Sequence, residues 1–342
     1  MKKTLNIIFA LVLLVCFHDL TVAQVNVKKT AQTSMKFLSI PIGARGSAMG
    51  EAFTAVAGHS EAMYWNPAGI RDVDLVDISA HYNKWIADIS YQNIAVVYNA
   101  ESIGFFGLNV SSVNYGTFYG TRRSEVSPDG YVETGEFSPD AFYAGLTYAR
   151  IISDNFSFGV NLKYIYQNLG SAYVGANGGM TTEEYKPVET KNSLLAFDLG
   201  VLYYTGFKDL RLAVVAQHLS KEIEYVESYG ERYPLPYVIK AGLAMDIFPF
   251  FLNENSEHVL TFALDVLHPR DYSERVHIGF EYVFNELLAV RGGYKFNYDE
   301  DNLSIGIGVM PTVSNVSLRF DYAYNPFGVF DGVHRISFGT SF

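Results

Sequence analysis

Residues 316–325 read Val-Ser-Leu-Arg-Phe-Asp-Tyr-Ala-Tyr-Asn, and residues 333–342 read Val-His-Arg-Ile-Ser-Phe-Gly-Thr-Ser-Phe. In each stretch, large apolar residues alternate with polar or small ones. Successive side chains of a strand point to opposite faces, so one face is apolar and the other carries charges. This pattern is typical of a strand between lipid and a polar lumen. The two stretches predict an all-β fold, a transmembrane antiparallel β-barrel.

The composition agrees with this prediction. Hydrophobic residues make up 49% of the 342 residues and charged residues 18%, against roughly 25% charged in an ordinary globular domain. Beyond the N-terminus there is no run of about 20 apolar residues that could span a bilayer as a helix. A closed sheet is then the way to pair all backbone groups in lipid, and a soluble β-sandwich is the alternative. The net charge of -11 argues against a nucleic-acid partner.

Residues 1–23 predict a secretory signal peptide. Lys2 and Lys3 precede an apolar segment at 5–17, and small residues end at the predicted cleavage site. The alternative, lipidation of Cys16, is disfavoured by the bulky residue before it. Removal of the signal leaves no cysteine, so disulfides and thiolate metal sites are not expected.

The remaining chain divides into a plug segment, residues 24–73, and a barrel, residues 74–342. The barrel part contains about fourteen alternating segments. Short predicted turns near 153–155, 206–208 and 285–286 alternate with long connections at 119–139, 170–192 and 221–234. Outer-membrane barrels have short periplasmic turns and longer extracellular loops. We therefore expect the long connections outside the cell, both termini in the periplasm, and an unusually long turn at 248–257.

The plug segment carries a motif of small residues followed by a turn. Its members are Gly43, Arg45, Gly46, Gly50, Trp65, Asn66, Pro67, Ala68 and Gly69. Asn-Pro disfavours helix at the asparagine, whose side chain can bond nearby backbone. Two interpretations remain open: the segment fills the barrel, or it moves to open a path.

This motif, with Phe37 to Ile40 and Glu61 to Ile70 around it, resembles the PorV/PorQ family of outer-membrane proteins, which is related to FadL-like transporters of hydrophobic compounds. The resemblance implies a FadL-like barrel with a plug in the cell outer membrane. It also implies the type IX secretion system, with secretion-system proteins and secreted cargo as partners. His59 stands where an acidic residue is expected in that family.

Charged residues on the predicted lumen face form a second candidate site. They are Arg275, His277, Glu281, Arg291, Lys295, Arg319 and Asp321. Arg or Lys costs about 2–4 kcal/mol at the lipid midplane but is tolerated in the lumen. We interpret these residues as a solvated ion-pair network that grips the plug; guidance of a substrate is the alternative.

Searches for catalytic motifs find no nucleophile elbow, zinc-protease helix or phosphate loop, so no catalytic residue, metal or cofactor is predicted. An outer-membrane phospholipase is the enzymatic alternative. The aromatic residues Phe338 and Phe342 predict an assembly signal for the barrel-insertion machinery. Outer-membrane lipid is the remaining expected partner.

Two functions therefore remain. The first is a non-enzymatic secretion partner that carries or attaches cargo through its long outer loops. The second is a passive transporter of hydrophobic molecules with a lateral opening near Gly104, Gly107 and Gly116, because glycine weakens strand pairing. The predominantly polar lumen and the family resemblance favour the first.

Overall fold

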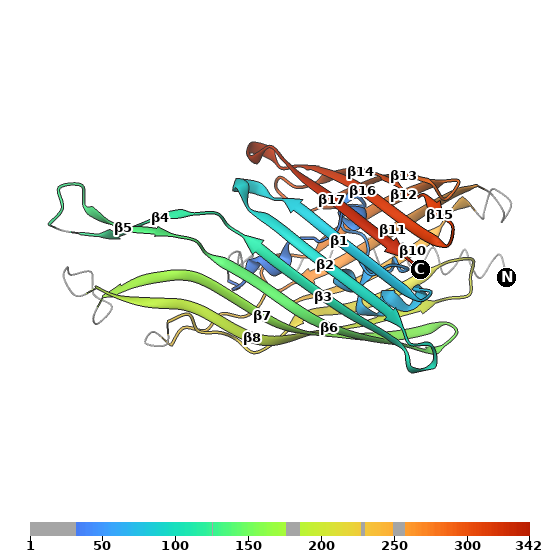
Figure 1. Cartoon of the computed structure of the whole chain (residues 1–342), viewed down its shortest axis with the longest axis horizontal. Coiled ribbons are helices and arrows are strands. Elements are labelled where there is room, and N and C mark those ends of the chain that lie inside the picture. The colour runs from blue at the N-terminus through green and yellow to red at the C-terminus, as the bar shows by residue number, and fades with distance from the viewer. Residues whose placement is uncertain (1–31, 125, 176–184, 227–229, 249–256) are drawn as a thin grey trace, which may run out of the picture.

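The computed structural model describes residues 32–124, 126–175, 185–226, 230–248 and 257–342 (Figure 1). The predicted signal peptide and the first part of the predicted plug, residues 24–31, lie outside the described residues. The strands are β1 Val76–Lys84, β2 Ser90–Asn99, β3 Phe105–Asn114, β4 Phe118–Arg123, β5 Tyr131–Phe137, β6 Asp140–Ser153, β7 Phe156–Gly175, β8 Tyr185–Tyr204, β9 Arg211–Leu219, β10 Val238–Asp246, β11 His258–Pro269, β12 Arg275–Phe284, β13 Leu288–Phe296, β14 Leu303–Val309, β15 Thr312–Val313, β16 Val316–Pro326 and β17 Gly332–Ser341. The helical turns are η1 Lys36–Ser39, α2 Ala44–Ala48, α3 Ala62–Trp65, η2 Pro67–Asp72, η3 Ile86–Asp88, η4 Glu101–Ile103 and η8 Gly328–Phe330.

Fourteen long strands of the described chain form a closed antiparallel ring. The order runs β14-β13-β12-β11-β10-β9-β8-β7-β6-β3-β2-β1-β17-β16, and pairing of β14 with β16 closes it. The first strand pairs with the last, Ile78 opposite Thr340. The two-residue β15 pairs only with β16, while β4 and β5 form a separate hairpin. This confirms the predicted barrel of fourteen strands.

Strict alternation of burial shows which face of the wall is apolar. In β3 every second residue is buried and the intervening ones are exposed; Leu108 and Val110 are among the outward side chains. On β14 the outward side chains are Leu303, Ile305 and Ile307. The apolar outer face is the lipid face of an outer-membrane barrel. Among the described residues, no helix is long and apolar enough to cross a membrane.

The connections differ in length at the two ends of the barrel. One end, here called the turn end, carries short links such as 154–155 and 285–287 together with the C-terminal strand end. The other, the loop end, carries the connections β3 to β6, β7 to β8 and β9 to β10. Short turns are periplasmic in such barrels, so an outward-facing loop end remains the prediction. The long turn predicted at 248–257 lies largely outside the described residues.

The predicted loops 119–139 and 170–192 are wrong in part, because each contains strand. β4 and β5 occupy much of the first, and β7 and β8 continue as a paired ribbon to Gly175 and Tyr185. In Figure 1 both ribbons project beyond the barrel at the left. Direct pairing of β3 with β6 ends at Asn114 opposite Asp140, so the β4–β5 hairpin stands clear of the ring.

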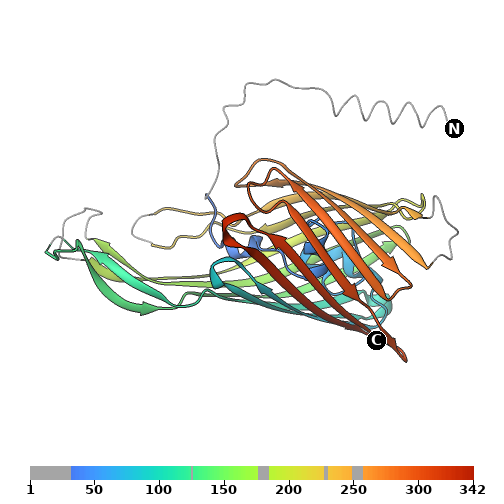
Figure 2. The same ribbon diagram turned by 90° about the horizontal axis from the view of Figure 1, so that it is seen from above.

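Residues 33–73 run inside the ring (Figure 2). Ser34 N donates to Pro234 O at 2.8 Å, and Lys36 Nζ lies 2.6 Å from Asp271 Oδ2; both partners belong to loop-end connections. The segment then passes through the lumen and enters β1 at the turn end. Its first described residues therefore lie at the end opposite the C-terminus, whereas the sequence predicts both termini in the periplasm; the N-terminus itself lies outside the described residues.

Candidate functional site

The small residues of the plug motif let the interior segment pack tightly. In α2, Ala44, Gly46, Ser47 and Ala48 are fully buried, and this helix packs against β14 and β16. A Cβ on Gly46 would lie 2.7 Å from the Trp65 ring. Only glycine leaves room for the indole at that point. The motif therefore holds two parts of the interior segment against each other.

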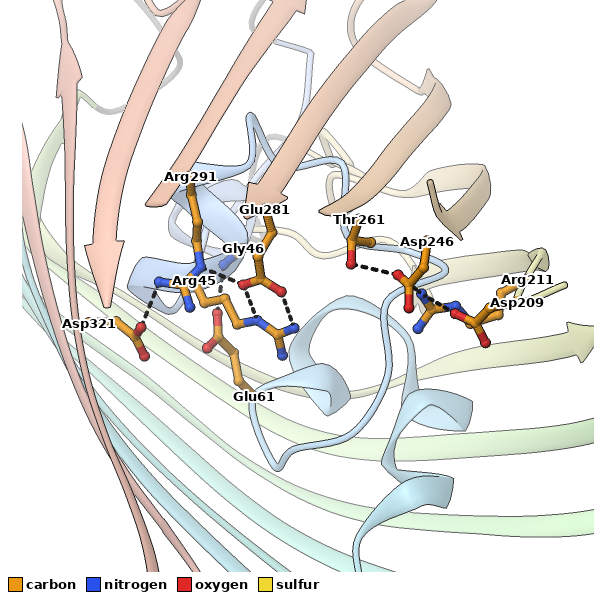
Figure 3. Close-up of polar contacts among 10 residues, drawn as sticks. All are labelled: Arg45, Gly46, Glu61, Asp209, Arg211, Asp246, Thr261, Glu281, Arg291 and Asp321. Carbon is orange, nitrogen blue, oxygen red and sulfur yellow. Dashed lines mark hydrogen bonds and ion pairs between the residues drawn. The ribbon is translucent and has the colours of Figure 1, made fainter. Parts of the chain in front are cut away.

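Four residues form the central ion-pair chain: Arg45, Glu281, Arg291 and Asp321 (Figure 3). Arg45 binds Glu281 through Nε and Nη2 at 2.8 and 2.6 Å. Arg291 Nε reaches the same carboxylate at 2.5 Å, and its Nη1 lies 2.6 Å from Asp321 Oδ1. Arg45 belongs to the interior segment and the other three to the wall. The chain thus ties the segment to β12, β13 and β16.

A second tie joins the interior segment to the first and last strands. Asp77 Oδ1 accepts from Ser60 N at 2.8 Å, and Asp77 Oδ2 accepts from Arg319 Nη2 and Ser341 Oγ, each at 2.6 Å. His59 lies beside it, 3.4 Å from the same carboxylate. These contacts cross the seam between the first and last strands, β1 and β17.

The other predicted lumen charges lie nearer the loop end and make separate contacts. Lys295 binds Glu51 of the interior segment at 2.5 Å and also pairs with Asp301. His277 Nε2 is 2.9 Å from Tyr298 Oη, and the Arg275 guanidinium stacks on that ring at 3.9 Å. The structure therefore divides the seven charges into three groups. It also buries most of them, which differs from the solvated network expected from the sequence.

The Asn66-Pro67-Ala68 turn is fixed by one buried amide. Asn66 Nδ2 donates to Thr54 O at 3.0 Å and to Val201 O at 3.1 Å, and its Oδ1 accepts from Ala68 N at 3.0 Å. This last bond caps η2. Gly200 lies directly against the Asn66 side chain, so the turn sits on a strand position that lacks a side chain.

Three polar anchors were not among the predicted site residues. Asp265 accepts from Phe53 N and Thr54 N at 3.0 Å each. Lys163 pairs with Asp198 at 2.7 Å. The alternation of β11, β7 and β8 places these charges on the lumen face, and that signal could have found them.

A third anchor lies at the turn end (Figure 3). Arg211 pairs with Asp209 at 2.9 Å and with Asp246 at 3.4 Å. Thr261 Oγ1 donates to Asp246 at 2.7 Å. This cluster joins the β8–β9 connection to β10 and β11.

A partly open pocket of about 120 Å³ lies at the loop end, between the interior segment and the wall. Its lining includes Lys36, Ile40, Trp65, Lys240, Arg275 and Tyr298. Drug-sized ligands usually occupy pockets of roughly 300–1,000 Å³. This space is closer to the roughly 150 Å³ cavity that holds one benzene. It has room for about one ring with a polar group.

The predicted assembly residues lie on the lipid face. Phe338 alternates with inward residues of β17 and packs against Phe320 at a ring distance of 5.1 Å. Phe342 follows the strand and is half exposed. Their recognition by the insertion machinery remains a prediction. In the described ranges, no group of three or more His, Cys, Asp or Glu residues is arranged to hold a metal ion.

Comparison with known families decides the assignment. The type IX secretion system membrane protein family PorP/SprF matches residues 131–339, more than half of the chain. The chain belongs to the PorP/SprF family. The uncharacterised protein family UPF0164 matches residues 18–207, again more than half, so the chain belongs to that family as well. Among curated proteins, none matches.

Solved structures similar to this PorP/SprF family protein share its fold. The Ralstonia pickettii toluene transporter TbuX is 16% identical with a TM-score of 0.53, covering 87% of this chain and 96% of its own. The Pseudomonas putida toluene transporter TodX is 12% identical with a TM-score of 0.55, covering 87% and 96%. A Pseudomonas aeruginosa FadL homologue is 11% identical with a TM-score of 0.50, covering 88% and 98%. These likenesses show a FadL-like outer-membrane barrel.

One carboxyl group of the PorP/SprF protein's interior segment makes stability depend on pH. Glu61 Oε1 accepts from Gly46 N at 3.0 Å, and burial raises the pKa of Glu61 to about 7 from its ordinary 4.5. The pKa is higher in the folded state, so the stabilising contribution is complete below pH 4.5 and is lost as pH rises through about 7. Between pH 5 and 8 we expect unfolding free energy to fall by up to about 3 kcal/mol more in the wild type than in Glu61→Gln. Equal pH slopes in urea titrations would contradict this.

Proposed function

We propose that this protein is a PorV/PorQ-type partner of type IX secretion, and that its outer ribbons contact secretion-system proteins or secreted cargo. The family match supports a secretion role at the outer membrane. The observation that carries the finer proposal is the β4–β5 hairpin. It projects beyond the ring and exposes large side chains, with Tyr119 and Val126 each 79% exposed.

Lipid does not cover the exposed aromatic and apolar side chains of the hairpin, so their exposure requires another explanation. Side chains on the lipid face of the wall are covered by acyl chains, but the hairpin stands beyond the direct pairing of β3 with β6. Phe118 and Tyr131 are exposed there as well. Apolar patches rimmed by polar groups are typical of protein interaction sites, and Tyr is enriched in such interfaces.

The interior supports the same proposal. Glu281, Asp77 and Asp265 each hold the interior segment by hydrogen bonds or ion pairs. Breaking a buried polar contact of this kind leaves an uncompensated buried charge, which destabilises the fold. An export partner needs a stable barrel with shaped outer ribbons, and this interior provides the stable barrel.

The test removes the hairpin and keeps the ring. Residues 115–139 are replaced by a short Gly/Ser turn joining Asn114 to Asp140, which already face each other. We expect normal barrel folding, judged by heat-modifiable migration, and at least a fivefold loss of a fluorescent secreted cargo from the surface of intact cells. A matched control replaces residues 328–330, in the short loop-end connection between β16 and β17, with the same linker; Val329 there is 87% exposed. Unchanged cargo display in the hairpin variant would overturn the proposal.

A passive transporter is the second candidate, and the loop-end pocket is the observation that favours it. Its volume suits about one ring, and TbuX and TodX are described as toluene transporters. Passage through the ring would require the interior segment to move, since Trp65 and Ile40 line the pocket from that segment. Trp65→Ala would then raise uptake of radiolabelled toluene by cells, while the hairpin replacement would not.

A further inference from the structure

The two outer ribbons leave strand edges that face each other, and we propose that an extended segment of a secreted protein adds between β5 and β7 as a further strand. The inference rests on the proposed function and specifies how the partner is held. Strand addition uses main-chain hydrogen bonds for affinity and alternate side chains for specificity.

The open edges follow from the pairing. β6 and β7 pair directly until Asp140 faces Asn168. Beyond that point, in the described chain, β5 pairs with β4 and β7 pairs with β8, but β5 and β7 do not pair with each other. In the ring β3 and β7 flank β6 on opposite sides. β4 continues β3 and β5 leads into β6, so the free edge of β5 is on the side of β7.

A groove of about 610 Å³ lies on the β4–β5 hairpin and reaches the foot of β7. Residues of β4 and β5, among them Tyr119, Arg122 and Glu136, form most of its lining, and β7 adds Gly170 and Ser171. At its foot the Phe137 ring lies against Gly170, where a Cβ would be 2.7 Å from the ring. The ribbons therefore meet at the barrel and separate outward, as Figure 1 shows. The free edges of β5 and β7 therefore start close together at the barrel and diverge outward.

The chemistry of the two free edges suits a peptide. Unpaired edges present rows of N–H and C=O groups, which act as a template for another chain. A peptide strand carries such groups along its whole length and can pair with these edges, whereas a lipid or small aromatic molecule has no repeating donors and acceptors. The walls add Arg122 on β4, Glu136 on β5 and the exposed Tyr119 ring. They fit a segment with alternating apolar and mixed-charge residues.

Thr134 allows a test that spares the hairpin. The β4–β5 register shifts there, with Gly120 opposite Gly135 and Thr121 opposite Glu133. Thr134 thus has no partner residue on β4, and proline at this bulge removes an N–H without removing a paired residue. We expect Thr134→Pro to reduce surface retention of the fluorescent cargo at least tenfold. Thr134→Ala, which keeps the N–H, should retain it within twofold.

Hydrogen exchange on the unmodified protein tests the binding mode even if Thr134→Pro fails to fold. The purified barrel is measured alone and with the purified fluorescent cargo. Strand addition predicts at least tenfold slower exchange of amides within 131–137 and 171–175. Unchanged exchange at both edges despite cargo binding would overturn strand addition. If the hairpin replacement abolishes retention while these amides stay unprotected, only this inference fails; if the replacement has no effect, the proposed function fails too.

Discussion

Glu281→Ala should lower the free energy of unfolding by about 3–5 kcal/mol, because it leaves buried guanidinium groups without their shared carboxylate. The Glu281 carboxylate accepts two hydrogen bonds from Arg45 and one from Arg291. In the variant Arg291 still pairs with Asp321. The measurement is urea unfolding in detergent micelles. Lys191→Ala is the control, since its ion pair with Glu189 is exposed, and it should cause no measurable change.

A double substitution separates the cost of an unpaired charge from the loss of packing. Arg45→Met with Glu281→Met removes both members of the pair and leaves Arg291 with Asp321. Buried pairs replaced by apolar residues of similar volume are often neutral or stabilising. We therefore expect the double variant to recover most of the stability lost in Glu281→Ala. A single Glu281→Ala change that costs less than about 1 kcal/mol would show that the central ion-pair chain does not hold the segment.

Gly293→Ala should displace the interior segment, whereas Gly292→Ala, one residue away, should not. A Cβ on Gly293 would lie 2.5 Å from the Gly50 Cα, a contact with backbone that cannot rotate away. The nearest atom to a Cβ on Gly292 is 3.9 Å distant. Overpacking typically costs about 1–3 kcal/mol. We expect raised conductance of the Gly293→Ala barrel in planar bilayers and wild-type conductance for Gly292→Ala.

The same pair of variants tests whether the interior segment seals the barrel while the outer ribbons act independently of it. If the wild-type conductance survives in both, the segment is not held against β13 at Gly50. If Gly293→Ala conducts and still displays cargo, the interior segment seals the barrel while the outer ribbons contact the partner. This combination is the one that the proposed function predicts.

The sequence predicts the barrel well because alternation is local. β16 and β17 can be recognised from consecutive residues, and their side chains fall on the expected faces. The β4–β5 hairpin is harder to predict. Gly120 and Gly135 interrupt the alternation of apolar and polar side chains in the hairpin. The register shift at Thr134 then changes which face of the hairpin the following side chains occupy. A prediction from periodicity therefore treats that stretch as loop.

The partners within the site depend on register and closure. Arg45 and Glu281 are 236 positions apart, and their contact requires both ring closure and the placement of α2. Sequence pattern places Glu281 and Arg291 on the lumen face, but it cannot show which carboxylate each arginine meets. The residue types of the Asn66 turn predict a turn, but the bond from Asn66 to Val201 depends on the folded wall.

The most direct measurement of the central claim compares proteins that co-purify with the wild type and with the hairpin variant lacking residues 115–139. Both barrels are isolated from detergent-solubilised outer membranes at equal amounts, and bound proteins are quantified by mass spectrometry. We predict that secretion-system proteins and secreted cargo accompany the wild type and fall at least fivefold in the variant. Equal recovery of these proteins with both barrels, or their absence from both, would contradict the claim that the outer hairpin carries the interaction.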